Sequence, residues 1–150
     1  MADNREEILA RMFTILATVT GMTSTFRNRG LIDNDQRPAL VLLDGDDSTK
    51  TTGSGRGRGR MSPVIISMSP QVFVVLKLAK PQNEHVGTDL NAVRSEIIAK
   101  FASDDELLAL IGTSGDISYD GCETDLKSGS PMEGQMRLDF TITTVMNPYT

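Results

Sequence analysis

The stretch MRLDFTITTVM, residues 136–146, has the clearest pattern in the chain. Apolar and polar side chains alternate along it, and its apolar positions are Met136, Leu138, Phe140, Ile142 and Met146. Successive side chains of a β-strand point to opposite faces of the sheet. The alternation therefore predicts a strand with one buried face and one solvated face, in a sheet that is covered on one side.

Three more stretches predict strands. ALVLLDG at 39–45 is a short apolar run bounded by proline and by Asp-Gly. Residues 72–79 are rich in β-branched side chains and almost continuously apolar, which indicates burial on most of both faces. Pro70 has no N–H for a strand ladder, so we expect an edge or a bulge near it. ISYDGCETDLK at 117–127 is the last of the three, with a break expected at Asp120-Gly121.

Helices are predicted where apolar residues recur at a spacing of three and four. The first covers about residues 4–20, with Asp3 as its N-cap and Gly21 as its stop. A second opens at Thr88, and a short third helix begins at Ser103 with a capping box and ends at Gly112. The order α-β-β-α-α-β-β predicts an α+β fold, in which two main helices and one short helix pack on a mixed or antiparallel sheet of about four strands.

Composition limits the classes of protein. The 150 residues predict a single domain over 1–150, and no apolar run is long enough to span a membrane or to form a secretory signal. The single cysteine, Cys122, fits a reducing compartment. Net charge is −5, and from Pro63 onward twelve acidic residues face six basic ones. An acidic half argues against general nucleic-acid binding, which needs a broad basic face.

A long flexible loop is predicted at about 44–63, where TTGSGRGRGRMS contributes arginines that alternate with glycines. Runs of this kind often bind nucleic acid, but such arms are normally longer and carry aromatic residues for base stacking. A loop that docks on acidic surfaces of a neighbouring chain and a plain disordered linker both remain open. The candidate assembly residues in this loop are Asp46, Asp47, Arg56, Arg58 and Arg60.

Catalytic and ligand-binding patterns are incomplete. GDDSTKT at 45–51 lacks the glycine before the lysine that a phosphate-binding loop needs. DGDD at 44–47 lacks the later glycine and glutamate of a calcium loop. His85 and Cys122 are the only residues of their kinds, which is too few for a zinc site, and nothing marks Cys122 as an activated nucleophile. We therefore expect no cofactor, no metal and no enzymatic activity.

Several stretches together resemble the tail terminator proteins of long-tailed bacteriophages, whose type member is the lambda minor tail protein U. The resemblance lies in an amphipathic N-terminal helix before RPALVLLDG, in the strand QVFVVLKL after a variable loop, and in a long helix followed by a short one ending in ELLALIG. A YDG segment and a terminal strand of the LDFTITTVMNPY type complete it. It is a pattern of elements over nearly the whole chain.

The resemblance implies a structural virion protein at the tail neck, assembled in the host cytoplasm. Such a protein forms a homohexameric ring on the last ring of the tail tube, ends tube polymerisation and presents a surface to the head-completion or neck protein. DNA passes only in transit through its lumen. Two alternatives stay open: another neck or tube component, such as a head-completion protein or a tail-tube subunit, and a small nucleic-acid-binding regulator.

Overall fold

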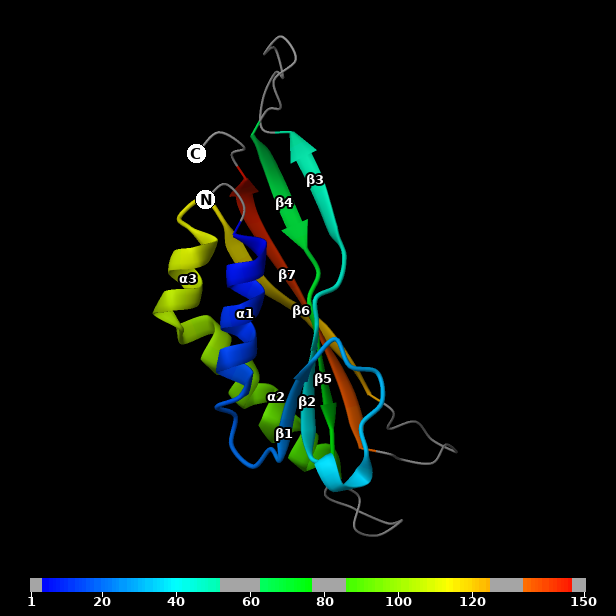
Figure 1. Ribbon diagram of the computed structural model, residues 1–150. Helices are drawn as coiled ribbons and strands as arrows, with labels where there is room; N and C mark the ends of the chain where they lie inside the picture. Colours follow the sequence, from blue (N-terminus) through cyan, green and yellow to red (C-terminus); the bar gives the residue numbers. More distant parts are fainter. Residues whose placement is uncertain (1–3, 52–62, 77–85, 125–133, 147–150) are drawn as a thin grey trace.

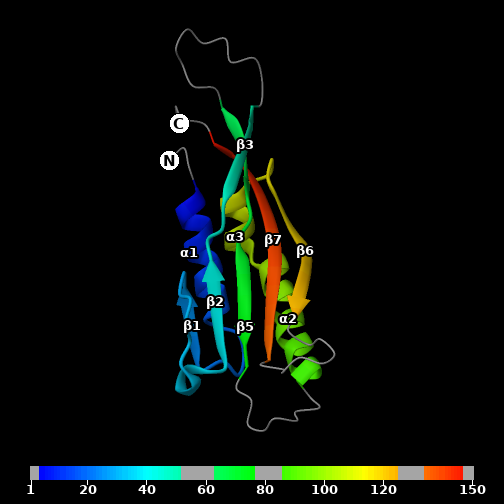
Figure 2. The same ribbon diagram turned by 90° about the vertical axis from the view of Figure 1, so that its right-hand side faces the viewer.

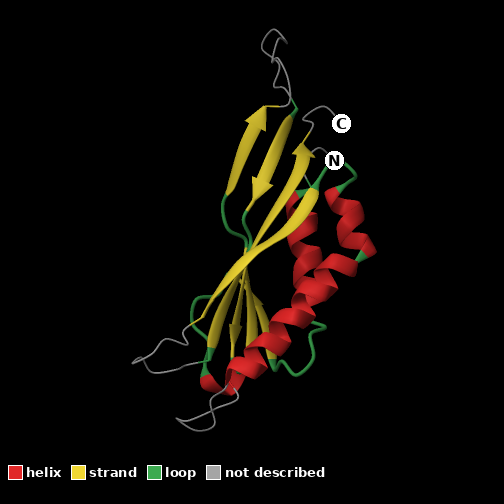
Figure 3. Ribbon diagram, turned by 180° about the vertical axis from the view of Figure 1, so that it is seen from behind, coloured by secondary structure: helices red, strands yellow, loops and turns green. Residues whose placement is uncertain are grey.

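The computed structural model describes residues 4–51, 63–76, 86–124 and 134–146. Within these ranges three α-helices lie on one face of a seven-stranded mixed sheet, and no described α-helix covers the other face (Figure 1; Figure 3). A short 3₁₀ helix, η1 (Asn34–Gln36), also belongs to the described residues. The α+β class is therefore confirmed. The predicted number of strands is wrong, because the sheet has seven strands instead of about four.

The longest strand, β7 (Gln135–Met146), organises the sheet. One edge of β7 pairs with β6 (Asp116–Thr124), and the other edge pairs with two strands placed end to end, β5 (Gln71–Val75) and β4 (Val64–Met68). The predicted alternation is confirmed: Phe140 is 2% exposed, whereas its neighbours on the strand are half-buried. All these pairings are antiparallel, and the predicted break in β6 is confirmed by a register shift between Tyr119 and Gly121.

The interruption expected near Pro70 separates β4 from β5. Pro70 has no N–H to donate, but its carbonyl accepts a hydrogen bond from the Phe140 N–H at 3.2 Å, so the gap stays attached to β7. The break lies in the interior of the sheet rather than at an edge, because β4 and β5 each pair with strands on both sides. β5 buries Val72, Val74 and Val75, whereas Phe73 is half-buried, so the predicted burial of both faces is only partly confirmed; residues 77–79 of the predicted strand lie outside the described ranges.

β4 and β5, placed end to end, form one interrupted row of strands, and a second interrupted row runs beside it. In it β2 (Ala39–Leu43) pairs with β5, and β3 (Asp47–Thr51) pairs with β4 as an edge strand. On the same side of β7 as β3, β1 (Ser24–Arg27) pairs in parallel with β2 and forms the edge of the sheet beyond it. The predicted loop over 44–63 is thus partly wrong, because its first third contains β3 and only residues 52–62 lie outside the described ranges.

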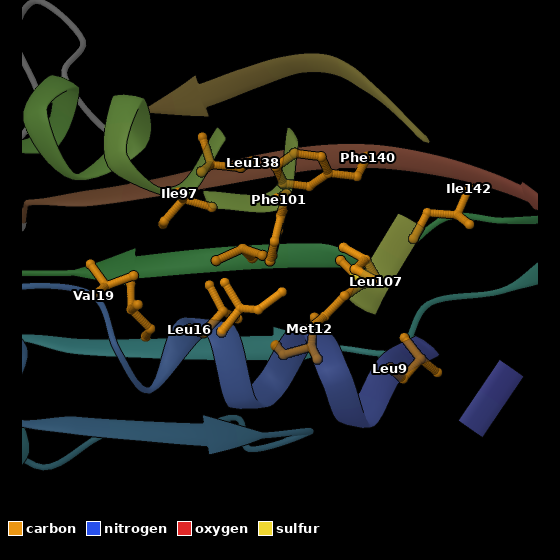
Figure 4. Close-up of a cluster of buried hydrophobic side chains, with 14 of the residues drawn as sticks. Leu9, Met12, Leu16, Val19, Ile97, Phe101, Leu107, Leu138, Phe140 and Ile142 are labelled. Atoms are coloured by element: carbon orange, nitrogen blue, oxygen red, sulfur yellow. The ribbon is translucent and has the colours of Figure 1, made fainter. Parts of the chain in front are cut away.

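The helices cover the apolar face of the sheet. They are α1 (Arg5–Leu16), α2 (Val86–Ser103) and α3 (Asp105–Ile111). Figure 4 shows side chains from α1, α2 and α3 meeting those of β7, and the rings of Phe101 and Phe140 pack edge to face with centroids 5.1 Å apart. The core is therefore one continuous layer between the helices and the sheet.

Four helix ends differ from the sequence prediction. The first helix has Asn4 rather than Asp3 as its N-cap, and the second begins at Val86 rather than at Thr88. The first helix ends at Leu16 instead of continuing to about residue 20. The third helix is capped by Asp104, whose carboxylate accepts a hydrogen bond from the Leu107 N–H at 2.8 Å, whereas Ser103 is the last residue of α2 and donates to the Ala99 carbonyl. The acidic cap also binds Arg11 of α1, and this second role explains why aspartate takes the position.

Candidate functional site

The hairpin formed by β3 and β4 carries the predicted assembly segment. Figure 2 shows both strands reaching beyond the ends of the helices at one end of the molecule. Arg56, Arg58 and Arg60 belong to the connection between the two strands and lie outside the described residues. β3 pairs with β4 alone, so its outer edge offers backbone groups that no described strand uses.

Asp46 and Asp47 lie at the base of this hairpin rather than at its tip. Asp46 is exposed, and its backbone carbonyl accepts a hydrogen bond from the Ser69 N–H at 3.0 Å, between the ends of β3 and β4. The Asp47 carboxylate lies 3.5 Å from Nε of Arg5 in α1. Arg5 also donates to the Gly45 carbonyl at 2.9 Å. The structure therefore uses Asp47 to hold the hairpin base against α1.

A cluster of charges centred on Arg27 strengthens the same junction. Its guanidinium donates two hydrogen bonds to the Asp44 carboxylate, at 2.8 and 3.0 Å, and two to the Glu6 carboxylate, at 2.8 and 2.9 Å. These bonds lower the pKa of Asp44 and of Glu6 and raise the pKa of Arg27. Paired forks of this kind fix geometry as well as charge. The cluster thus links α1, β1 and the end of β2.

The turn at Gly45 can hold no other residue without strain. Its φ angle is +71°, and a Cβ atom built there would overlap the backbone carbonyl of Ser69. Only glycine adopts this conformation without cost and leaves room for the neighbouring strand. The two rows of the sheet therefore approach closely at this point, and the hairpin keeps a fixed direction relative to the domain.

The sheet face away from the helices contains a cavity of about 380 Å³. Its floor consists of apolar side chains of β2 and β5, namely Val41, Leu43, Phe73 and Val75. Its rim comes from the segment after β1 and includes Arg29, Leu31 and Arg37. Leu31 is 86% exposed. This surface was not predicted from the sequence, because residues 22–38 lack the periodicity that marks a packed element.

Other predicted candidates are not brought together. Cys122 is exposed on β6, and His85 lies outside the described residues. Among the residues that the structure describes, no group of three or more His, Cys, Asp or Glu side chains is placed to hold a metal ion. In the same ranges, no helix is long and apolar enough to cross a membrane.

Sequence reasoning could not find the Arg27 cluster. Its two carboxylates lie 21 positions before and 17 positions after Arg27 in the chain, and no local spacing connects them. The one available signal was Asp44-Gly45 directly after an apolar strand, which is typical of a sharp turn.

Comparisons with known proteins identify a structural likeness but no family. No protein-family model and no curated protein matches the chain. Among solved structures, the chain is similar to one from an extracellular contractile injection system, the PVC sheath/tube terminator in its extended state, determined by cryo-electron microscopy. The identity is 12% and the TM-score 0.45, over 96% of this chain and 56% of that one. This likeness assigns neither a family nor a function.

Proposed function

We propose that this chain is a tail terminator, a structural virion protein that closes the head-proximal end of a phage tail tube. In this role it forms a homohexameric ring on the last tube ring, stops tube polymerisation and offers the surface on which the neck is joined. It is not an enzyme and uses no cofactor. DNA passes through the lumen of the ring without being held there.

The observation that supports this proposal is the agreement between the resemblance and the folded elements. The stretches that resemble tail terminators form α1, β2, β5, α2, α3, β6 and β7 in the described structure. They therefore belong to one packed layer of helices on one sheet rather than to scattered surface segments. The variable loop of the pattern, between RPALVLLDG and QVFVVLKL, includes the strands β3 and β4.

The hairpin also suits an assembly role. The Arg27 cluster and the ion pair between Asp47 and Arg5 fix the base of the hairpin, so contacts within the domain set the direction of β3 and β4. The arginines of residues 52–62 can then bind carboxylates of a neighbouring subunit, since guanidinium and carboxylate groups pair in a bidentate way. A segment that gripped DNA strongly would instead hinder passage of the genome.

Electron microscopy of the purified protein at high concentration separates a terminator from a tube subunit. A terminator is expected to give free subunits or single rings, since its ring offers no surface for the next identical ring. Long tubes of stacked rings would contradict the proposal and identify a tube protein.

A gel-shift assay at physiological salt addresses the nucleic-acid-binding regulator. The terminator proposal predicts no shifted band with duplex or single-stranded DNA, because the chain is acidic overall. A salt-resistant, sequence-dependent shift would favour the regulator instead.

A further inference from the structure

The segment after β1 presents a leucine that is held out from the surface. Leu31 is 86% exposed, and its backbone carbonyl accepts a hydrogen bond from Nε of Arg29 at 3.1 Å. The Arg29 guanidinium also stacks on the ring of Phe26, with Cζ 4.3 Å from the ring centroid. On the other side, Arg37 donates to the Ile32 carbonyl at 3.3 Å. These two arginines therefore hold the backbone on both sides of the exposed leucine side chain.

The two arginines beside this leucine differ from most others in the described part of the chain. Arg5, Arg11, Arg27 and Arg137 each form an ion pair with at least one carboxylate. Within the described ranges, neither Arg29 nor Arg37 has such an ion pair. An exposed apolar side chain flanked by two cations without carboxylate partners fits a surface that is apolar in the middle and acidic at its rim.

The chain itself contains a surface of that kind, between the end of α3 and the start of β6. A hollow of about 340 Å³ lies there, and its apolar lining includes Leu108, Ile111 and Ile117. Leu108 is 39% exposed, one of the few large apolar side chains that the described surface leaves open. Asp116 stands exposed at the rim and forms no ion pair with any described residue.

The shape of this hollow is fixed by tight packing below it. A Cβ atom at Gly115 would overlap the carbonyl oxygens of Thr143 and Ile111. The Thr144 hydroxyl donates a hydrogen bond to the same Ile111 carbonyl at 3.1 Å, and that hydroxyl belongs to a residue only 3% exposed. The turn between α3 and β6 is therefore anchored to β7, and the hollow persists without a partner.

The two surfaces lie on opposite sides of the molecule. Figure 1 shows the segment that joins β1 to β2 on the side of the sheet away from the helices, near one end. It shows α3 on the helical side, near the other end. A contact between them must join two different copies in a head-to-tail manner, and repetition of such a contact closes into a ring when the rotation permits.

We propose that Leu31 of one copy inserts into the α3–β6 hollow of the next copy, with Arg29 of the first facing Asp116 of the second. This inference rests on the proposed function and names the contact that would build its ring. It also accounts for the exposure of Leu31 and Leu108, which each lose solvent-exposed apolar area in the contact.

Disulfide trapping between two variants tests the contact, with Cys122→Ser in both chains to remove the exposed native thiol. One chain carries Leu31→Cys and the other Thr113→Cys, a position that also lines the hollow. After mild oxidation at high protein concentration, the mixture is expected to give disulfide-linked heterodimers. Each variant alone is expected to give almost none, because a head-to-tail contact does not bring identical positions together.

Charge reversal supplies the matched control. Arg29→Glu in the first chain, or Asp116→Lys in the second, should lower the rate of heterodimer formation by about tenfold, because like charges then face each other across the contact. Combining both reversals should restore it. Asp89→Lys changes net charge equally on an exposed part of α2 and should leave the rate unchanged.

Equal trapping in the mixture and in the separate variants would overturn the contact, as would equal effects of Asp116→Lys and Asp89→Lys. The outcome is distinct from that of the proposed function. Rings on tails without this disulfide would leave the terminator role standing and remove the contact. Formation of the disulfide without rings on tails would support the contact between copies and contradict the terminator role.

Discussion

Replacing Phe140 by alanine probes the packing that joins the helices to the central strand. The Phe140 ring is 2% exposed and packs against Phe101 of α2 and Tyr119 of β6, with centroid distances of 5.1 and 5.6 Å. Its neighbour Thr141 points to the opposite face, where its hydroxyl donates a hydrogen bond to the Asp120 carboxylate. Adjacent residues thus offer a buried site and a matched surface site on one strand.

The two substitutions should differ several-fold in cost. Truncating a buried phenylalanine to alanine lowers the free energy of unfolding by about 3–5 kcal/mol. Two aromatic neighbours place Phe140→Ala in the upper part of that range, since each such pair contributes about 0.5–1.5 kcal/mol beyond area burial. Thr141→Ala removes one hydrogen bond near solvent, worth about 0.5–1.5 kcal/mol. Total stability of small domains is only about 5–15 kcal/mol.

Urea unfolding followed by circular dichroism measures the difference. With a slope of about 2 kcal/mol per molar urea, Phe140→Ala should lower the midpoint by about 2 M, and Thr141→Ala by about 0.25–0.75 M. Unchanged slopes would show that both variants unfold from the same compact state. Equal midpoint shifts for the two variants would refute the assignment of the buried and solvated faces of β7.

Three further substitutions test the hairpin and its base. Gly45→Ala should destabilise the fold by about 1–3 kcal/mol, since it forces a positive φ on alanine; a thermal melt equal to that of the parent would contradict the close approach at this turn. Arg27→Met should destabilise most at neutral pH. Folding lowers the pKa of Asp44, so its contribution is present above the unfolded value near 3.8 and is lost as pH falls through the folded value. The difference between parent and variant should therefore shrink below about pH 4, and a pH-independent difference would exclude the ion pair as its source. Replacing Arg56, Arg58 and Arg60 together by serine should leave the melting temperature unchanged but weaken assembly on tails. Parental yields of joined particles from this triple variant would show that the loop has no role in assembly.

The central part of the fold follows from hydrophobic periodicity. β7 and the helices each bury one face, so their side chains repeat with a period of two or of three to four, and these periods are visible in the sequence. The break in β6 and the interruption at Pro70 were also predicted, because glycine and proline act on the backbone locally. These features depend on near neighbours in the chain.

The missed strands depend on distant neighbours. β3 reads DSTKT and lies at an edge, where little of the strand is buried, so no apolar alternation marks it. β1 has only four residues, all half-buried, and it forms because β2 offers a parallel edge. Pairing with an existing strand can stabilise a segment whose own sequence predicts a loop.

The assembly role of the candidate site residues stays a prediction. Asp46 and Asp47 were expected to take part in assembly, and the pairing of Asp47 with Arg5 at the base of the hairpin was not foreseen. Such ion pairs join surface residues far apart in the chain, so composition alone cannot assign partners to them. The role of Arg56, Arg58 and Arg60, which lie outside the described residues, also stays a prediction.

Cryo-electron microscopy of tails made by the genome that encodes this chain tests the terminator role most directly. The account predicts one closed ring of six copies at the head-proximal end of each tail tube, with the β3–β4 hairpin directed toward a neighbouring subunit or ring. Finding the chain repeated along the tube, as a monomer or dimer without cyclic symmetry, or absent from the tail would contradict it.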